Sequence, residues 1–309
     1  MSTFESNKKR RELNEKLIKL ALISAATISI LTTFGILFSI LFEAIEFFKL
    51  RSFWYFITGT EWSPGVVGSK FGAVPIFAGT FMITFIALLV AIPIGLGSAV
   101  YMSEYANLKL RDYLKPILEV LAGIPTVVYG FFAAITVAPL IVKMAGAIGL
   151  DATFNSALAS GVVMGIMIIP VISSLSDDVI RSVPDSQRKA AYGLGLTHGE
   201  VIRNIVLPSA MPGIISASLL GLSKALGETM IVVMAAGLRP NLSWNPLEDM
   251  TTVTVTIVNS LVGDFEFNSP ATLSAFALGL MLFIVTLILN MISLSLIRKF
   301  KEKYKINTL

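Results

Sequence analysis

Six long apolar segments constrain what this chain can fold into more than any other feature. A helix needs about 20 residues to cross a bilayer, and segments of that length or more cover roughly 17–42, 73–102, 116–140, 156–176, 210–238 and 272–297. They predict an all-α, polytopic membrane protein with six transmembrane helices. The expected organisation is a basic segment at 1–16, a membrane domain at 17–300 and a tail at 301–309. The first segment is longer than the apolar part of a cleavable signal peptide, so we expect it to remain as a membrane span.

Composition excludes several other classes of protein. Of 309 residues, 55% are hydrophobic and 14% charged, whereas about 25% of residues are charged in an ordinary soluble chain. The chain has no cysteine and a single histidine, His198, so thiolate and clustered-histidine metal sites are not expected. Its net charge of +4 comes from basic residues that flank the apolar segments. We therefore expect contact with a lipid bilayer and none with nucleic acid.

The distribution of Lys and Arg predicts the orientation in the membrane. If the N-terminus is cytoplasmic, the four segments on that side hold six, three, four and five of the 24 basic residues, and the outside loops hold five. Basic residues are enriched in cytoplasmic loops. Both termini and the 177–209 loop are therefore predicted to be cytoplasmic.

The 177–209 loop carries signals for two short helices. Ser182 is a candidate N-cap with Asp185 three residues later, Gly193 and Gly195 can end that helix, and Thr197 with Glu200 has the spacing of a capping box. This spacing alone is equally compatible with a helical elbow that only joins two membrane spans. His198 has no identifiable carboxylate partner in this loop, and we expect its side chain to face solvent or a partner.

The order of residues in the loop resembles the "EAA" coupling loop of ABC importer permeases, in which Glu-Ala-Ala is followed at fixed spacing by Gly and Ile-x-Leu-Pro. The resemblance implies the MetI-like fold of type I ABC importers, and a short helix that docks in a groove of a separate ATPase. ATP and Mg would bind to that partner, because this chain has no Gly-Lys dipeptide and so no Walker A loop. Lys189 stands where the family has Glu, and the positions in register are Ala190, Ala191, Gly195, Ile205, Leu207 and Pro208.

Two further motifs are similar to those of the phosphate importer permeases, the Pst family. One is 123–132 in the third segment, with Gly123, Pro125, Thr126, Tyr129 and Gly130; the other is 225–230 in the fifth. The stretches 59–62, 71–73 and 103–106 are more similar to the PstC subunit than to its paralogue PstA. The resemblance implies inorganic phosphate as the solute and a complex with a PstA-type permease, two PstB-type ATPase subunits and a PstS-type extracytoplasmic phosphate-binding protein.

Lys224 and Glu228 are ionisable residues within the fifth apolar segment. A charged side chain near the bilayer centre costs at least about 2.5 kcal/mol on insertion scales, so such residues usually face a bundle interior and serve a solute path. They are four residues apart, one helical turn, on a stripe of small residues. We predict that they line the phosphate path; the alternative is an ion pair that only ties helices together. The phosphate permeases typically have Arg at position 224. For Tyr129 and Thr126 we expect packing and backbone hydrogen bonding.

Two other classes of membrane protein were considered. A secondary transporter or channel would show matched halves with broken helices, and an intramembrane hydrolase would need a nucleophile with a base at membrane depth. The sequence has neither pattern. Within the ABC family, the alternatives are a PstA-type subunit or a permease for sulfate, molybdate or phosphonate.

Overall fold

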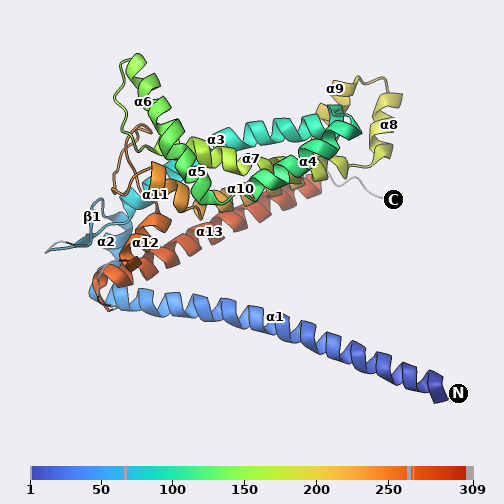
Figure 1. The fold of residues 1–309 in the computed structure, drawn as a ribbon, viewed down its shortest axis with the longest axis horizontal. Helices are drawn as coiled ribbons and strands as arrows, with labels where there is room; N and C mark the ends of the chain where they lie inside the picture. The colour runs from blue at the N-terminus through green and yellow to red at the C-terminus, as the bar shows by residue number, and fades with distance from the viewer. Residues whose placement is uncertain (1, 66–67, 263–265, 267, 304–309) are drawn as a thin grey trace.

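The protein is almost entirely helical in a computed structural model, which describes residues 2–65, 68–262, 266 and 268–303 (Figure 1). One antiparallel pair of two-residue strands joins Trp62 to Phe71 and Ser63 to Lys70. In chain order the elements are α1 (Ser2–Leu50), α2 (Phe53–Thr58), β1 (Trp62–Ser63), β2 (Lys70–Phe71), α3 (Val74–Val100), η1 (Tyr101–Tyr105), α4 (Leu108–Ala122), α5 (Thr126–Phe132), η2 (Ala133–Val137), α6 (Ala138–Ala147), α7 (Ala157–Arg181), α8 (Asp185–Gly193), α9 (His198–Val201), η3 (Ile202–Val206), α10 (Leu207–Leu226), α11 (Met230–Ala235), α12 (Val253–Val262) and α13 (Pro270–Lys303), where η marks a π-helical turn.

Six helical segments are long and apolar enough to cross a membrane, as predicted. They are Asn14–Leu50, Val74–Tyr105, Thr126–Ala147, Ala157–Arg181, His198–Leu226 and Pro270–Lys299. The polypeptide is therefore a multi-pass membrane protein. Of the expected terminal segments, residues 2–16 are continuous with α1, and residues 304–309 of the tail lie outside the described part.

The third span does not occupy 116–140 as predicted. The helix ends at Ala122, and α5 begins at Thr126 with Pro125 as its N-cap. Proline has no N–H and pushes the preceding residue out of helical geometry, so the chain breaks before Pro125. The segment before the break, α4, has one polar and one apolar face and no buried residue, and the apolar span starts only after the break.

The fifth span is also interrupted, whereas the sequence predicted a continuous segment at 210–238. Helix α10 ends at Leu226 and α11 starts at Met230, so Gly227, Glu228 and Thr229 lie between two helices. A carboxylate that bonds to nearby backbone N–H groups stabilises such an interruption, because it replaces hydrogen bonds that a continuous helix would make. Glu228 makes bonds of this kind, described below.

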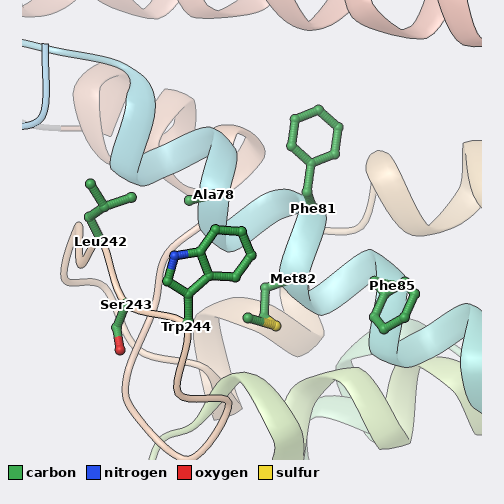
Figure 2. Close-up of a pocket in the computed structure, with 7 residues that line it drawn as sticks. All are labelled: Ala78, Phe81, Met82, Phe85, Leu242, Ser243 and Trp244. Carbon is green, nitrogen blue, oxygen red and sulfur yellow. The ribbon is translucent and has the colours of Figure 1, made fainter. Parts of the chain in front are cut away.

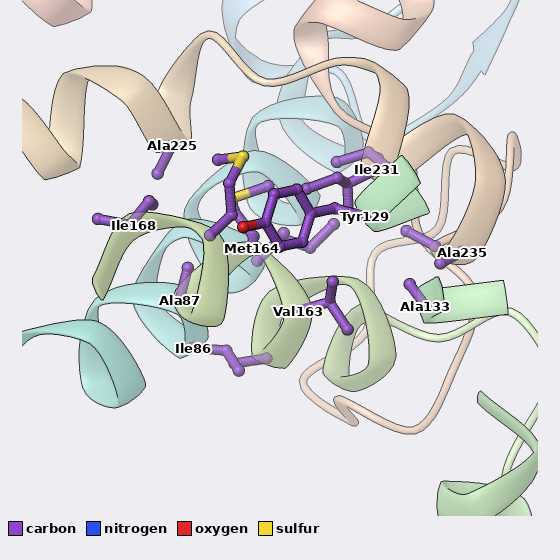
Figure 3. Close-up of a cluster of buried hydrophobic side chains, with 14 of the residues drawn as sticks. Ile86, Ala87, Tyr129, Ala133, Val163, Met164, Ile168, Ala225, Ile231 and Ala235 are labelled. Atoms are coloured by element: carbon purple, nitrogen blue, oxygen red, sulfur yellow. The ribbon is translucent and has the colours of Figure 1, made fainter. Parts of the chain in front are cut away.

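The largest buried cluster lies where α3, α7, α5 and α11 meet (Figure 3). Helices α3 and α7 pack against each other, and Tyr129 of α5 lies in the same cluster beside Met164 and Ile231. Burying such side chains contributes roughly 1.5–3 kcal/mol each for the larger ones. This packing fixes α5 and α11, the two short helices that follow the breaks, against the long helix α7.

The two ends of the bundle differ in what they carry. Helices α8 and α9 lie at one end, and α2 with the strand pair lies at the opposite end (Figure 1). The N-terminal end of α1 and the C-terminal end of α13 both point toward the end with α8 and α9. This arrangement places the 177–209 loop and both terminal helix ends on one side of the six spans.

The 239–271 connection, whose structure the sequence left open, contains helix α12 (Val253–Val262). Helix α12 packs against α13, and Val253 N–H donates to Thr80 Oγ1 of α3 at 3.0 Å. The connection is therefore held to the bundle in the part that the structure describes.

Candidate functional site

The 177–209 loop forms two short helices, but the first begins later than predicted. Ser182 is the C-cap of α7, and α8 starts at Asp185 after Pro184. The Ser182 hydroxyl donates to the Val179 carbonyl at 2.7 Å, so it is engaged with the preceding helix and does not cap the next one. The predicted capping box of α9 is confirmed: Thr197 N–H donates to Glu200 Oε2 at 2.8 Å.

Gly195 connects the two helices in a left-handed conformation. Its φ is +84°, and its N–H donates to the Tyr192 carbonyl at 2.9 Å. Left-handed geometry is accessible to glycine at little cost and places a Cβ too close to the following carbonyl in other residues. No atom lies within 4 Å of the position that a Cβ would take at Gly195, so backbone conformation and not packing requires this glycine.

The predicted coupling residues divide into two groups by burial. Ala191 is 4% exposed, and Ile205 and Leu207 pack against the same buried cluster, so these three hold the loop together. Ala190 and Gly195 are exposed, and Pro208 is half-buried. Only the exposed side of the loop is available to a partner.

Two exposed side chains on that side were not singled out in the sequence. Leu194 is 82% exposed between two glycines, and Tyr192 is 45% exposed. The sequence did contain a signal for Leu194, because a large apolar residue between two glycines in a polar loop indicates an exposed contact residue. His198 is exposed, as expected, and its Nδ1 lies 2.6 Å from the Tyr192 hydroxyl.

Glu228 is buried in the interruption between α10 and α11. Its side chain is held by the backbone: Met230 N–H and Ile231 N–H both donate to Oε1, at 3.0 and 3.3 Å. The residue is 8% exposed, and its carbonyl accepts a bond from the Thr254 hydroxyl of α12 at 2.8 Å. Oε2 has no hydrogen bond to any residue that the structure describes, so it remains available as an acceptor.

Lys224 lies in the last turn of α10 and is half-buried. The two residues are not on one continuous helix, because α10 ends at Leu226. Within the described chain, no ion pair joins Lys224 to Glu228 or to another carboxylate. The structure therefore does not contain the Lys224–Glu228 tie that was the alternative to a solute path.

The third-span motif stabilises the break at Pro125. The Tyr129 hydroxyl donates to the Leu121 carbonyl at 2.9 Å, and a Cβ on Gly130 would lie 2.7 Å from Met234 Sδ. Gly130 thus allows α5 to approach α11, which follows Glu228. Gly123 is the C-cap of α4, and Thr126 is half-buried in the first turn of α5. These residues position the broken helices, as expected for Tyr129.

A cavity of about 280 Å³ lies between α3 and the loop after α11 (Figure 2). Figure 2 shows the indole of Trp244 beside α3, with Ser243 as the one hydroxyl among the lining side chains. An oxyanion would find no cation there, so this cavity suits an apolar group and not the solute. Its lining residues are Ala78, Phe81, Met82, Phe85, Leu242, Ser243 and Trp244.

Comparison with known protein families identifies the family to which this chain belongs. Residues 91–305 match the family described as "Binding-protein-dependent transport system inner membrane component", a stretch that includes both broken spans and the 177–209 loop. The chain belongs to this family of ABC transporter permeases. Its PstC-type relationship follows from individual relatives. The phosphate transport system permease protein PstC of Mesorhizobium japonicum is 37% identical over 252 residues, 76% of this chain and 75% of that protein.

Other relatives agree over nearly the full length. PstC of Xylella fastidiosa strain Temecula1 is 33% identical over 91% of both chains, and the probable ABC transporter permease protein YqgH of Bacillus subtilis is 30% identical over 97% of this chain and 95% of that one. Among solved structures, the inward-facing MetNI methionine ABC transporter matches with a TM-score of 0.54 at 18% identity, over 74% of this chain and 94% of that one. The last similarity concerns the fold alone and confirms the predicted MetI-like architecture.

As an ABC transporter permease of the PstC type, the chain is a transport subunit and not an enzyme. It belongs to a transport complex with an ATPase and a binding protein. Two parts of the permease are candidates for these tasks: the exposed side of the 177–209 loop, and the charged side chains of half-buried Lys224 and buried Glu228 at the α10–α11 interruption.

Proposed function

We propose that this chain is the PstC-type permease subunit of an ATP-driven importer of inorganic phosphate. It forms half of the translocation path and couples to a separate ATPase through the 177–209 loop. The proposed partners are a PstA-type permease, PstB-type ATPase subunits that bind ATP and Mg, and a PstS-type extracytoplasmic phosphate-binding protein. Both termini and the 177–209 loop are cytoplasmic in this proposal, as the distribution of basic residues favours.

The observation that carries the proposal is the buried carboxylate of Glu228 in a broken membrane span, with both of its side-chain hydrogen bonds within the described chain on Oε1 and none on Oε2. Broken helices at membrane depth occur where they line a cavity or a substrate site. Half-buried Lys224 is the nearest cation in sequence and has no carboxylate partner among the described residues, so its charge is available to an anion. The identity of the solute, inorganic phosphate, is proposed from the names of the related permeases described above.

The chemistry distinguishes phosphate from sulfate. Inorganic phosphate keeps at least one proton near neutral pH, because the last of its three protons leaves only in strongly alkaline solution, and sulfate keeps none. Glu228 Oε2 is positioned to accept a hydrogen bond from that proton, and Lys224 attracts the negative charge. With sulfate, Oε2 would face a second acceptor, and an unmet buried hydrogen bond costs on the order of 1–3 kcal/mol.

The test is transport by the complete complex. The chain is co-expressed with the PstA-, PstB- and PstS-type subunits, reconstituted in proteoliposomes and supplied with ATP, and uptake of radiolabelled phosphate is measured. We expect ATP-dependent phosphate uptake that sulfate, molybdate and phosphonate at tenfold excess do not inhibit. Uptake of one of these anions in place of phosphate would contradict the assignment, and uptake by the isolated chain without ATP would contradict the ABC mechanism.

A further inference from the structure

The side chain of Arg188 joins the coupling loop to a helix that is not adjacent in sequence. Arg188 lies on α8 directly before Lys189, and its Nη1 contacts both carboxylate oxygens of Glu104, at 2.6 and 2.7 Å. Glu104 belongs to η1, the π-helical turn that ends α3, 84 residues earlier in the chain. Its side chain is 4% exposed and that of Arg188 is 17% exposed, so the ion pair is shielded from solvent.

The same guanidinium also binds the end of α7. Arg188 Nη2 donates to the Ile180 carbonyl at 2.9 Å, and Nε donates to the Val183 carbonyl at 3.5 Å. A planar guanidinium holds several acceptors in a fixed geometry, which a lysine ammonium does not. Arg188 therefore fixes α8 relative to both α3 and α7.

A second contact ties α9 to the same turn of α3. His198 Nε2 lies 3.3 Å from the Glu104 carbonyl oxygen, and the Tyr105 and His198 rings meet edge to face with centroids 5.2 Å apart. The buried face of the loop also packs on Ala99 near the end of α3. Both helices of the coupling loop thus contact a single turn, Tyr101–Tyr105.

The covalent connections of the loop run elsewhere. Helix α8 follows α7, and α9 leads through η3 into α10, so the loop is joined covalently to these two spans. Helix α3 and its last turn η1 are separated from α8 along the chain by α4, α5, η2, α6 and α7. Besides its packing against α7, α3 is contacted by the loop itself at Tyr101–Tyr105.

We infer that the Arg188–Glu104 pair is the joint that makes α3 move with the coupling loop when the ATPase changes conformation. Both are positioning residues: they act through α3 and are not assigned contacts with ATP or with the solute. Glu104 belongs to the 103–106 motif. This motif is part of neither the surface proposed to contact the ATPase nor the proposed solute path. A π-helical turn is a common device where a helix must adjust at a functional position.

The test separates docking, ATP hydrolysis and transport in the reconstituted complex. In Glu104→Gln and Arg188→Gln, we expect the ATPase to co-purify normally, because exposed Tyr192 and Leu194 are unchanged. ATP hydrolysis continues, but the amount of solute moved per ATP falls about tenfold, within the range for mutations that weaken coupling between sites. A normal ratio of transport to hydrolysis in both variants would overturn the inference.

A matched control distinguishes a joint from a general loss of stability. Arg111 of α4 donates to Asp177 of α7 at 2.8 Å in a pair that is similarly buried and involves neither α8 nor α9. Asp177→Asn removes that pair, and we expect lower thermal stability with an unchanged ratio of transport to hydrolysis. An equal fall in the ratio for Asp177→Asn would show general softening and overturn the inference.

A chemical rescue completes the test, because the chain has no cysteine of its own. Glu104→Cys combined with Arg188→Cys removes the ion pair, and a short reducible bis-methanethiosulfonate crosslinker restores a fixed connection. We expect crosslinking to raise transport per ATP and reduction to lower it again. Crosslinking that blocks transport would show that the loop slides past α3 and would overturn the inference. These outcomes rest on ATPase coupling and not on phosphate, so a complex that carries another oxyanion is tested with that anion.

Discussion

The Tyr129 hydroxyl donates a 2.9 Å hydrogen bond to the backbone carbonyl of Leu121, across the break at Pro125. The bond connects the last turn of α4 to the first turns of α5. It holds the angle at which the third span enters the membrane, and Tyr129 itself is buried in the cluster that α5 shares with α7 and α11. A motif that resembles a family signature therefore has a structural task at a helix break.

Tyr129→Phe keeps the ring in the cluster and removes this bond. We expect a loss of stability of about 0.5–1.5 kcal/mol, the usual net contribution of one hydrogen bond. The measurement is thermal unfolding of the purified complex in detergent. Tyr113→Phe is the matched control, because Tyr113 is 75% exposed on α4 and no hydrogen bond of its hydroxyl is present in the described chain. Equal stabilities for the two variants would contradict the role of the bond.

Helix breaks show which features of this fold follow from sequence and which do not. Hydropathy over 20 residues identifies all six spans, because the bilayer thickness sets their length. Mean hydropathy over 20 residues did not reveal the breaks at Pro125 and Gly227, because a single proline or glycine changes that mean very little. The break at Glu228 depends on a carboxylate bonding to two N–H groups, a competition between local geometries that periodicity does not report.

The candidate sites divide in the same way. The capping box at Thr197 and the end of the first loop helix near Gly193 and Gly195 are local features, and their spacing predicted them. The contact of Arg188 with Glu104 joins residues 84 positions apart and depends on how α3 packs against the loop. No short-range pattern encodes such a contact. The missed N-cap at Ser182 has a simple cause: α7 continues to Arg181, so the serine ends that helix and Pro184 separates it from the next.

Gly195→Ala and Gly193→Ala are expected to shift stability in opposite directions. A non-glycine residue in the left-handed conformation of Gly195 costs roughly 1–2 kcal/mol. Gly193 has no positive φ and closes α8, and alanine is favoured over glycine in a helix by about 0.5–1 kcal/mol. Neither site has an atom within 4 Å of a new Cβ, so packing contributes to neither change.

The measurement is co-purification of the ATPase after mild heating of the complex. Gly195→Ala should release the ATPase at a lower temperature than wild type, and Gly193→Ala at the same or a higher temperature. The same behaviour from both variants would mean that the loop serves only as an elbow between two spans.

Membrane orientation is testable with single cysteines in this cysteine-free chain. Ser186 on α8 and Asn245 on the loop after α11 are both exposed. In intact cells an impermeant maleimide should label Asn245→Cys and not Ser186→Cys, and permeabilised cells should label both. Labelling of Ser186→Cys in intact cells would reverse the proposed orientation.

Glu228→Gln distinguishes a solute-path carboxylate from one that only stabilises the helix break. A glutamine side-chain oxygen still accepts bonds from Met230 N–H and Ile231 N–H, so the break is preserved while the negative charge is lost. If Glu228 serves the solute path, this variant should assemble normally and lose phosphate uptake by about tenfold or more, the effect of roughly 1.4 kcal/mol or greater at the site. If it serves only the break, uptake stays at the wild-type rate.

Lys224 provides the complementary test of charge. Lys224→Ala removes the cation from a position that forms no ion pair in the described chain, so assembly should be unaffected and phosphate uptake should fall by a similar factor. Lys224→Arg keeps the charge and offers a planar fork to the oxyanion, and it should be active. Because no Lys224–Glu228 ion pair exists to be broken, the two neutral variants should not rescue each other when combined. Wild-type uptake by both single variants, or failure of both at the stage of assembly, would show that neither charge lines the path of the solute.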